Sequence, residues 1–422
     1  MLEGSAVSGE KFVYFYQKRS LRKRQRETVK AASLLKDLKV STNFPVDFEG
    51  NTVEEKGARR KHGFLYKLKT ALVTYLPLLN VAYIKRNELD SLKAREGESF
   101  LYTWGTIPFC LGSSGGLNAF KFVVELDNPY VLTFYNRTAF RMYSSVIKKM
   151  LGSPRVHKIA AISKAAAAHT AALLGEEVKE KVEVIYPYVE DFRADFPSEN
   201  SEKNDGPLKI LFVGKDFLGK GGEEAIIAFS ELRRKHGERV FLTIISDRRR
   251  EDLKGKLPLD GVRILPLMPR DQVRRDYFLR SDIFLLPTFY ESFGIVFLEA
   301  LASGMAIVGT NVYAVPEMVV NGFNGYAVQH PFTPSEKHIF RGEELIFANP
   351  VGERLNVYRS KLPKLKKKMR GNYEEFIHGL VVSLEEVVER VEEFKQNSRR
   401  LFEEKFHPSV WGKNFLRLFC TS

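Results

Sequence analysis

The chain has 422 residues, of which 44% are hydrophobic and 28% charged, a composition that predicts a folded protein of two domains and excludes a disordered or collagen-like chain. Its two cysteines, Cys110 and Cys420, are too few for a disulfide framework or a four-thiolate zinc site, which favours a reducing cytoplasm. The net charge of +14 is uneven, because residues 1–150 hold 25 lysines and arginines against 14 acidic residues.

Neither a secretory signal nor a membrane span is expected. The first ten residues lack an apolar core, and the apolar stretch 70–84 is too short to cross a bilayer. Basic runs at 18–26 and 58–69 carry much of the positive charge. They indicate either a surface that attracts phosphates of nucleic acid, lipid headgroups or a substrate, or an ordinary solvated surface.

The first half of the chain predicts an α/β domain with an irregular pattern. Its candidate strands are residues 11–16, 99–104, 130–135, 158–163 and 182–187. The segment 190–207 is polar, contains two prolines and is typical of a linker. We therefore expect a first domain over residues 1–200.

The second half alternates more clearly between strands and helices. Expected strands are 208–214, 239–246, 262–267, 282–287 and 305–310, and expected helices are 221–237, 270–281 and 293–304. Apolar strands that alternate with helices of this length predict a parallel sheet covered on both faces. The second domain is expected over residues 201–400.

This alternation stops after Val328. Residues 330–371 are longer than an ordinary connection and end in a basic run, which indicates an insertion, a lid or a partner surface. Residues 372–406 return to helical spacing, and residues 401–422 are expected to contain a closing helix.

An anion site is indicated where a strand ending at Gly214 meets the following helix. Lys215 and Lys220 come next, and Gly221–Gly222 opens the helix. Free amides at a helix N-terminus, glycines that admit an anion, and two ammonium groups suit a phosphate or diphosphate. The pattern is also close to a P-loop, but Gly221 stands where that loop needs Ser or Thr, which disfavours a nucleoside triphosphatase. A glycine turn between solvated lysines is the alternative.

Two glutamates in an apolar run indicate a ligand with several hydroxyl groups. Glu291 precedes the expected helix 293–304 and Glu299 lies inside it. Eight helical residues span roughly 12 Å, which is too far for a glycosidase pair, whose carboxyl groups lie about 5–9.5 Å apart. The spacing suits two contacts along an extended ligand, and ion pairs with neighbouring arginines are the alternative.

Three segments of the second half together resemble the donor half of retaining GT-B glycosyltransferases of family four, the glycosyl transferases group 1. They are ILFVGKDFLGKGG, RILPLMPRDQVRRDYFLRSDIFLLP and ESFGIVFLEALASG. The resemblance covers about residues 208–328, and the two glutamates eight positions apart are its most specific feature. It implies an α/β fold of GT-B architecture, in which two Rossmann-like domains with doubly wound parallel sheets face a cleft. Residues 401–422 would return toward the first domain.

The resemblance also implies roles for single residues. Glu299 would bind the ribose hydroxyls of a nucleotide sugar and Glu291 the hydroxyls of its sugar, while Lys215 and Lys220 would neutralise the diphosphate. Glu291, Lys220 and Lys215 are the expected catalytic residues. Further donor contacts are expected from Gly214, Gly221, Leu267, Met268, Phe293, Gly294 and Ile295, with Leu267 and Met268 near the base.

The chain departs from the family at three places. Lys215 stands where the family usually has arginine, so the charge is kept and a bidentate contact is lost. No glycine-rich loop follows the strand 11–16, and LGSSGG at 111–116 is a later candidate. Asn136 and Arg137 lie where relatives carry a histidine and are candidate donor or acceptor contacts, with a simple strand-end turn as the alternative.

The implied reaction moves a hexose-type sugar, with retention, from a UDP-, GDP- or ADP-sugar to a hydroxyl of a glycan or lipid-linked acceptor. Because two lysines and helix amides would stabilise the leaving diphosphate, and no Asp-x-Asp occurs in the chain, neither a metal nor another cofactor is expected.

Two further questions stay open at this point. Lysines and arginines around Phe64, Leu65 and Tyr66 suggest peripheral contact of a cytoplasmic protein with the anionic inner membrane face, although an ordinary core helix explains them equally well. The alternative functions are another GT-B enzyme, such as a nucleotide-sugar epimerase, and a basic nucleic-acid-binding protein. No nucleic acid is expected, because the chain has no recognition module.

Overall fold

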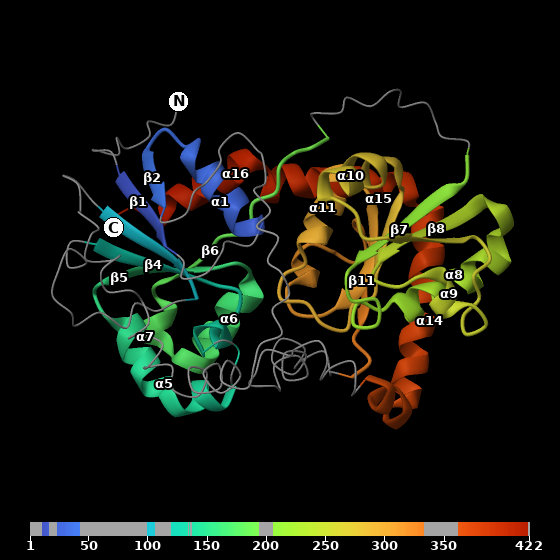
Figure 1. Cartoon of the computed structure of the whole chain (residues 1–422), viewed down its shortest axis with the longest axis horizontal. Coiled ribbons are helices and arrows are strands. Elements are labelled where there is room, and N and C mark those ends of the chain that lie inside the picture. Colours follow the sequence, from blue (N-terminus) through green and yellow to red (C-terminus); the bar gives the residue numbers. More distant parts are fainter. Residues whose placement is uncertain are drawn as a thin grey trace. The chain divides into compact units, whose positions relative to one another are not determined.

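The computed structural model describes residues 11–16, 23–42, 99–105, 120–133, 135, 137–193, 206–332 and 362–420. These residues form two compact units, each built on a six-stranded parallel sheet (Figure 1). Among the described residues, those up to Tyr188 and from Trp411 onward belong to unit 1, and those from Val189 to Val410 belong to unit 2. The expected α/β class with parallel sheets is confirmed. The predictions for residues 58–69, 70–84 and 111–116, and most of 18–26 and 330–371, lie outside the described residues.

In unit 1 the strand order is β2-β1-β3-β4-β5-β6, and all neighbouring strands run parallel. The strands are Lys11–Tyr16 (β1), Leu38–Thr42 (β2), Ser99–Trp104 (β3), Phe120–Leu126 (β4), Val156–Ala161 (β5) and Val182–Val184 (β6). The helices are Lys23–Ser33 (α1), the 3-10 helix Pro129–Thr133 (η2), Arg137–Gly152 (α5), Lys164–Leu174 (α6), Glu176–Lys179 (α7) and Pro408–Arg417 (α16), of which residues from Trp411 onward belong to this unit.

The predicted strand 130–135 is wrong, because this stretch begins with the 3-10 helix η2. The Oδ1 atom of Asn128 accepts a hydrogen bond from the backbone N–H of Tyr130 at 2.9 Å, and Pro129 follows Asn128 directly. An Asn-Pro pair favours the start of a turn and ends an extended segment. The strand of this region is β4, whose charged residues Lys121 and Glu125 interrupt its apolar pattern.

The core of unit 1 is completed by the last described residues of the chain. Trp411, Phe415, Leu418 and Phe419 are buried in one apolar cluster with residues of β1, β3 and α1. The ring centroids of Phe415 and Trp411 lie 4.5 Å apart in a stacked arrangement. In this unit α1 and α16 cover one face of the sheet and α5, α6 and α7 cover the other (Figure 1).

The sheet of unit 2 has the strand order β12-β11-β10-β7-β8-β9. Its strands are Leu208–Gly214 (β7), Val240–Ser246 (β8), Val262–Pro266 (β9), Ile283–Leu286 (β10), Ala306–Asn311 (β11) and Gly325–Gln329 (β12). Its helices are Gly222–His236 (α8), Arg250–Leu253 (α9), Arg270–Asp276 (α10), Ile295–Ser303 (α11), Arg370–Glu389 (α14) and Val391–Leu401 (α15), with 3-10 turns Gly237–Arg239 (η3), Phe278–Arg280 (η4) and Val315–Glu317 (η5) and a π-helical turn Phe402–Phe406 (η7).

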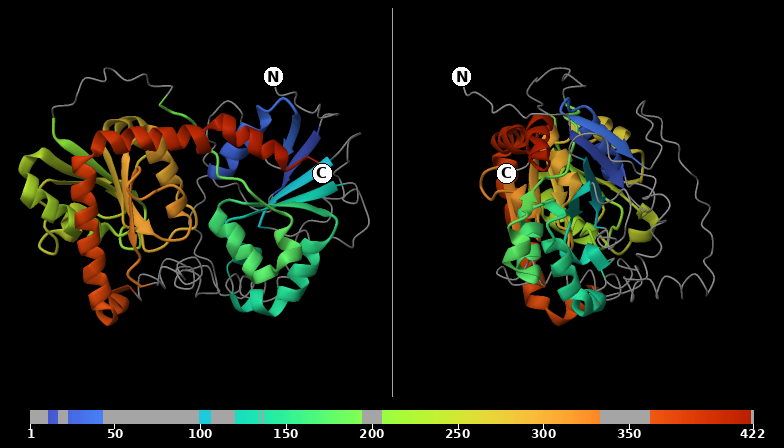
Figure 2. Two further views of the ribbon diagram at one scale, coloured as in Figure 1. Left: turned by 180° about the vertical axis from the view of Figure 1, so that it is seen from behind. Right: turned by 90° about the vertical axis from the view of Figure 1, so that its left-hand side faces the viewer.

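The strand order of this sheet reverses in its middle, between β10 and β7. The five strands predicted for this half are confirmed, and β12 is an additional strand. Helices lie on both faces of the sheet, as the left view of Figure 2 shows from behind, with α8 beside α14 and α11 beside α15. Since the order reverses between β7 and β10, the loops after these two strands flank the switch point, where open α/β sheets bind ligands.

Within the ranges that the structure describes, no helix is both long and apolar enough to cross a membrane.

Candidate functional site

Two loops meet at the switch point of unit 2. One follows β7 and leads into α8, and the other follows β10 and leads into α11. The backbone N–H of Phe289 donates to the carbonyl of Gly219 at 3.0 Å, and the hydroxyl of Tyr290 donates to Oδ2 of Asp216 at 2.7 Å. The loops therefore form one continuous surface at the carboxyl edge of the sheet.

Gly221 lets the first loop pass close to the second. Its φ is +76°, and a Cβ at this position would lie 2.0 Å from the carbonyl oxygen of Pro287. The residue caps α8, so the amides of the first helical turn face this edge of the sheet. Gly222 is equally constrained, because its Cβ would lie 2.2 Å from the ring of Phe217. The amides of Gly221 and Gly222 donate to the carbonyls of Leu218 and Phe217, so the amides that can accept an anion at this N-terminus are those of the residues after them.

The two predicted lysines differ in their surroundings. Nζ of Lys220 donates to Oε2 of Glu291 at 2.7 Å and to the carbonyl of Tyr290 at 3.0 Å, and it lies 4.5 Å from the centroid of the Tyr290 ring. Lys215 is exposed and forms no ion pair with any described residue. One ammonium group is thus fixed in the loop surface, and the other extends into solvent.

The second loop brings Glu291 and the start of α11 to the same edge. Glu291 is largely buried and is held by Lys220. Gly294 caps α11 with a φ of +90°, and a Cβ there would lie 2.6 Å from the ring of Phe297. Ile295 is the first residue of the helix, and Phe293 is buried just before it. The first turn of α11 therefore presents its amides beside Glu291.

Glu299 lies within α11, where two arginines of α10 contact it. Nε of Arg274 donates to Oε1 of Glu299 at 2.7 Å, and Nε of Arg270 donates to the same oxygen. Both predicted glutamates therefore lie in ion pairs. Glu299 pairs with arginines, the expected alternative to ligand contacts, whereas Glu291 pairs with the lysine Lys220. Sequence reasoning missed both arginines, although they lie four residues apart in one of the segments that carry the family resemblance.

The remaining predicted residues are spread more widely. Gly214 is the last residue of β7 and is buried, whereas Leu267, which is 47% exposed, and Met268 follow β9 at the edge of the sheet. Asn136 lies outside the described residues, as does the side chain of Arg137, the first residue of α5.

A buried cluster of charged side chains joins the first turn of α8 to residues 366 and 373. Glu224 is fully buried, accepts a hydrogen bond from the hydroxyl of Tyr373 at 2.7 Å and contacts Nζ of Lys366. Lys366 also donates to Glu223 at 2.8 Å. Burial alone would lower the pKa of Lys366, but the carboxylates of Glu224 and Glu223 raise it above its usual value. Sequence reasoning did not find this cluster, because its members are far apart in the chain.

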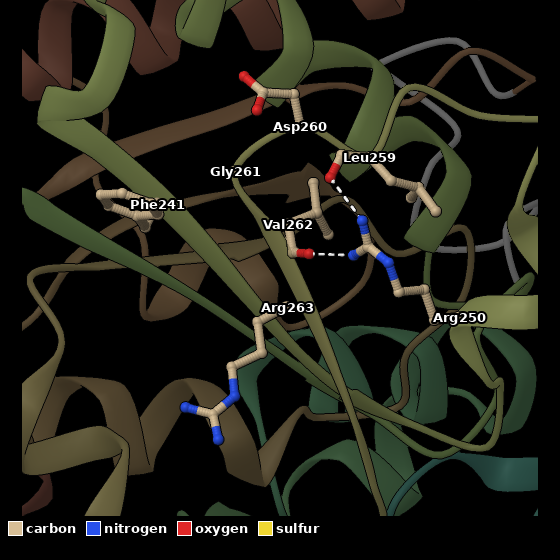
Figure 3. A pocket seen from close by; sticks show the side chains of 7 residues that line it. All are labelled: Phe241, Arg250, Leu259, Asp260, Gly261, Val262 and Arg263. Carbon is tan, nitrogen blue, oxygen red and sulfur yellow. Dashed lines mark hydrogen bonds between the residues drawn. The ribbon is translucent and has the colours of Figure 1, made fainter.

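A separate open cavity of about 570 Å³ lies beside β9 (Figure 3). It is lined by Phe241, Arg250, Leu259, Asp260, Gly261, Val262 and Arg263. Arg250 donates to the backbone carbonyls of Leu259 and Val262 and so closes one side of it. The cavity contains none of the residues predicted for the site. Among the described residues, no group of three or more His, Cys, Asp and Glu side chains is placed to hold a metal ion.

Part of the second unit is similar to known proteins. Residues 194–338 match the model of the family described as glycosyl transferases group 1. Glycogen synthase of Mycobacterium tuberculosis is 33% identical over 125 residues, which are 28% of this chain and 30% of that protein. An uncharacterized glycosyltransferase of Methanocaldococcus jannaschii is 31% identical over 171 residues, 37% of this chain and 43% of that protein. Each match spans less than half of the relative.

Solved structures similar to this chain cover almost all of it. Anabaena HepE in complex with UDP aligns with a TM-score of 0.54 and 13% identity over 97% of this chain and 99% of that one. Sucrose-phosphate synthase from Thermosynechococcus elongatus aligns with a TM-score of 0.55 and 12% identity over 97% and 98% of the two chains. At such identities the likeness establishes the fold, and the expected GT-B fold is confirmed.

Proposed function

We propose that the chain is a glycosyltransferase that uses a nucleotide-diphosphate sugar, because residues 194–338 match the model of the glycosyl transferases group 1 family. The observation that carries the proposal is the surface at the switch point of unit 2, which brings together two lysines, Glu291 and the N-termini of α8 and α11. The solved complexes of HepE contain UDP and, in one case, glucose, which supports a donor of this class.

The diphosphate of the donor would lie against the start of α8. Lys215 and Lys220 would contact its oxygens together with the free amides of the first turn of α8, beyond Gly221 and Gly222, whose own amides donate to Leu218 and Phe217. Negative charge develops on the diphosphate as the bond to the sugar breaks, and fixed cations and amides stabilise that charge without rearranging. The exposed Lys215 is free to follow the diphosphate, whereas Lys220 is already held in place.

The sugar and the nucleoside would lie on either side of the diphosphate. Glu291 would accept hydrogen bonds from hydroxyls of a hexose-type sugar, supported by the backbone amides of Phe293, Gly294 and Ile295. Glu299 would bind the ribose. The base would lie toward Leu267 and Met268, beyond the carboxyl end of β9; these residues complete the proposed donor site.

The rest of the reaction is proposed from the family resemblance. The acceptor would be a hydroxyl of a glycan or of a lipid-linked sugar, and it would attack the face from which the diphosphate leaves, so that configuration is retained. A diphosphate oxygen would take the proton of the acceptor. We propose that neither a metal nor another cofactor takes part, and that the basic first part of the chain brings a cytoplasmic enzyme to the anionic inner membrane face.

A panel of UDP-, GDP- and ADP-sugars tests the donor proposal. We expect one donor to raise the melting temperature of the protein and to give ligand-observed NMR signals, with or without EDTA. Glu299→Ala should weaken both effects, whereas Lys254→Ala, which removes an exposed lysine next to α9, should leave them unchanged. Absence of any response across the panel would contradict the proposed function, and a response only with added divalent metal would contradict metal independence.

A further inference from the structure

Glu299 is anchored by one of its two carboxylate oxygens. Arg270 and Arg274, four residues apart on α10, both donate through Nε to Oε1. No described residue donates to Oε2. An oxygen of a carboxylate can accept about two hydrogen bonds, so Oε1 is saturated by the arginines while Oε2 keeps its full capacity.

Of the two arginines that bind Glu299, Arg274 is the more firmly fixed. The side chains of Glu299 and Arg274 are 3% and 5% exposed, and that of Arg270 is 19% exposed. The guanidinium carbon of Arg274 lies 5.1 Å from the ring centroid of Phe192, and its Nη1 lies 3.5 Å from Oε2 of Glu190. Arg274 is thus fixed by an aromatic face and a second carboxylate, and releasing Glu299 would cost this buried guanidinium its shortest ion pair.

We propose that Arg270 and Arg274 are positioning residues that hold Glu299 by Oε1 and direct Oε2 to the two neighbouring hydroxyls of the donor ribose. The inference rests on the proposed function. It reconciles the ion pairs of Glu299 with a role in ligand binding, since the arginines and the ribose use different oxygens. The two acceptor positions of Oε2 match the 2′ and 3′ hydroxyls of a ribonucleotide.

Selection against deoxyribonucleotides follows from this arrangement. A buried carboxylate oxygen that loses one of its two donors keeps an unsatisfied acceptor, and sites built to bind a hydroxyl discriminate strongly against analogues that lack it. If the arginines no longer fix Glu299, the carboxylate can rotate, and both nucleotides are bound by the diphosphate and base alone. The arginines therefore control the ratio of the two affinities and not the affinity for the diphosphate.

The test measures the Kd of the preferred nucleoside diphosphate, chosen from UDP, GDP and ADP, and of its 2′-deoxy form by calorimetry on the full chain. We expect the wild type to prefer the ribonucleotide at least tenfold. Arg274→Gln and Arg270→Gln should reduce this preference to threefold or less by weakening only the ribonucleotide. Arg275→Gln is the matched control, because Arg275 lies on the same helix and pairs with Asp276 instead; it should change neither Kd.

The outcomes separate this inference from the proposed function. A wild type that binds none of the three diphosphates contradicts both. If the wild type binds them and both arginine variants keep its preference for the ribonucleotide, only the positioning role is overturned. If Arg274→Gln unfolds the protein, Arg270→Gln decides the question, because its side chain is partly exposed. In a Glu299→Gln background the arginine substitutions should have no further effect on the ratio, and an undiminished effect there would also overturn the inference.

Discussion

Two glycines of unit 2 share a backbone conformation but not an environment. Gly221 has a φ of +76° and is crowded by Pro287, whereas Gly255 has a φ of +75° and no atom lies within 4 Å of an added Cβ. Gly255→Ala should cost about 1–2 kcal/mol from the left-handed backbone alone. Gly221→Ala should cost a further ~1–3 kcal/mol from the clash. Urea unfolding followed by circular dichroism measures both, and equal losses would contradict the close approach of the two loops.

Lys220 should matter more for the reaction than for the fold. Removing one group that stabilises developing charge typically lowers the rate about 10²–10³-fold, so we expect Lys220→Ala to reduce kcat/KM for the donor by about 10²-fold. Lys254→Ala supplies the control in steady-state kinetics. Unchanged kinetics in Lys220→Ala would show that the ion pair with Glu291 is only structural.

The sequence predicted which loops lie at the carboxyl edge of the sheet of unit 2 but not how their charges are paired. Glycines, lysines and glutamates at strand ends have a local signature, so Gly221, Lys220 and Glu291 could be chosen from their spacing. The arginines that bind Glu299 depend on how α10 lies against α11, which no local pattern contains. For the same reason the pairing of Lys220 with Glu291 across 71 positions was not predicted.

At the scale of elements, α15 holds the segment with which unit 2 begins. Nη1 of Arg399 donates to Oδ1 of Asp191 at 2.7 Å. Burial alone would raise the pKa of Asp191, but the hydrogen bonds and the charge of Arg399 outweigh it and lower the pKa below its usual value. A carboxyl group with a lower pKa in the folded state stabilises the fold above its unfolded pKa, and this contribution is lost as the pH falls through the folded value.

Asp191→Asn should therefore destabilise the protein in a pH-dependent way. The difference in the free energy of unfolding between variant and wild type should be largest near neutral pH and should shrink below about pH 4, the usual pKa of aspartate. Denaturant unfolding across pH 3–7 measures it. Glu403→Gln, which removes the exposed partner of the same arginine, should give a smaller difference. A difference that does not vary with pH would exclude a contribution from this charge.

The cluster behind α8 allows a test by a pair of substitutions. Lys366→Met leaves the fully buried Glu224 without its cation, and breaking a buried ion pair in this way typically costs about 3–5 kcal/mol. Lys366→Met combined with Glu224→Gln should recover much of this loss, because no buried charge remains. Thermal and urea unfolding of the four proteins give the coupling energy. Strictly additive effects would show that the two residues do not interact.

Elements with strong apolar alternation were predictable, and those set by a single contact were not. Five of the six strands of unit 2 lie where their Val, Ile and Leu runs predicted them, and β12 was not predicted. The strand expected at 130–135 failed because the side chain of Asn128 caps a 3-10 turn, an interaction that outweighs the β propensity of the residues after it.

For the whole molecule, Phe415 connects the end of the described chain to the core of unit 1. Phe415→Ala should destabilise unit 1 by about 3–5 kcal/mol, the usual cost of removing a buried phenylalanine side chain. Both tryptophans, Trp104 and Trp411, belong to unit 1, so the transition followed by tryptophan fluorescence reports on that unit. We expect it to move to lower urea concentration, whereas Lys413→Ala on the exposed side of α16 should leave it in place.

This part of the architecture shows the limit of local sequence patterns. The apolar spacing of α16 predicts a helix, but its packing against β1 joins residues such as Phe15 and Phe415, which lie 400 positions apart in the chain. The GT-B fold was recognisable from the motifs of unit 2, whose strands and ligand loops are consecutive in the chain. Unit 1 lacks comparable motifs, and its core combines segments from both ends of the described sequence.

That shared core sets an order of events during synthesis on the ribosome. Domains usually fold as they emerge, the earliest first. Here the strands of unit 1 are made first, yet Trp411, Phe415 and Phe419, which close its interior, are made after every strand of unit 2. Until the second half has left the exit tunnel, the apolar surface that these residues cover stays exposed on unit 1. Exposed apolar surface favours aggregation, so we expect unit 1 to be the part of the nascent chain with the greater need of a chaperone.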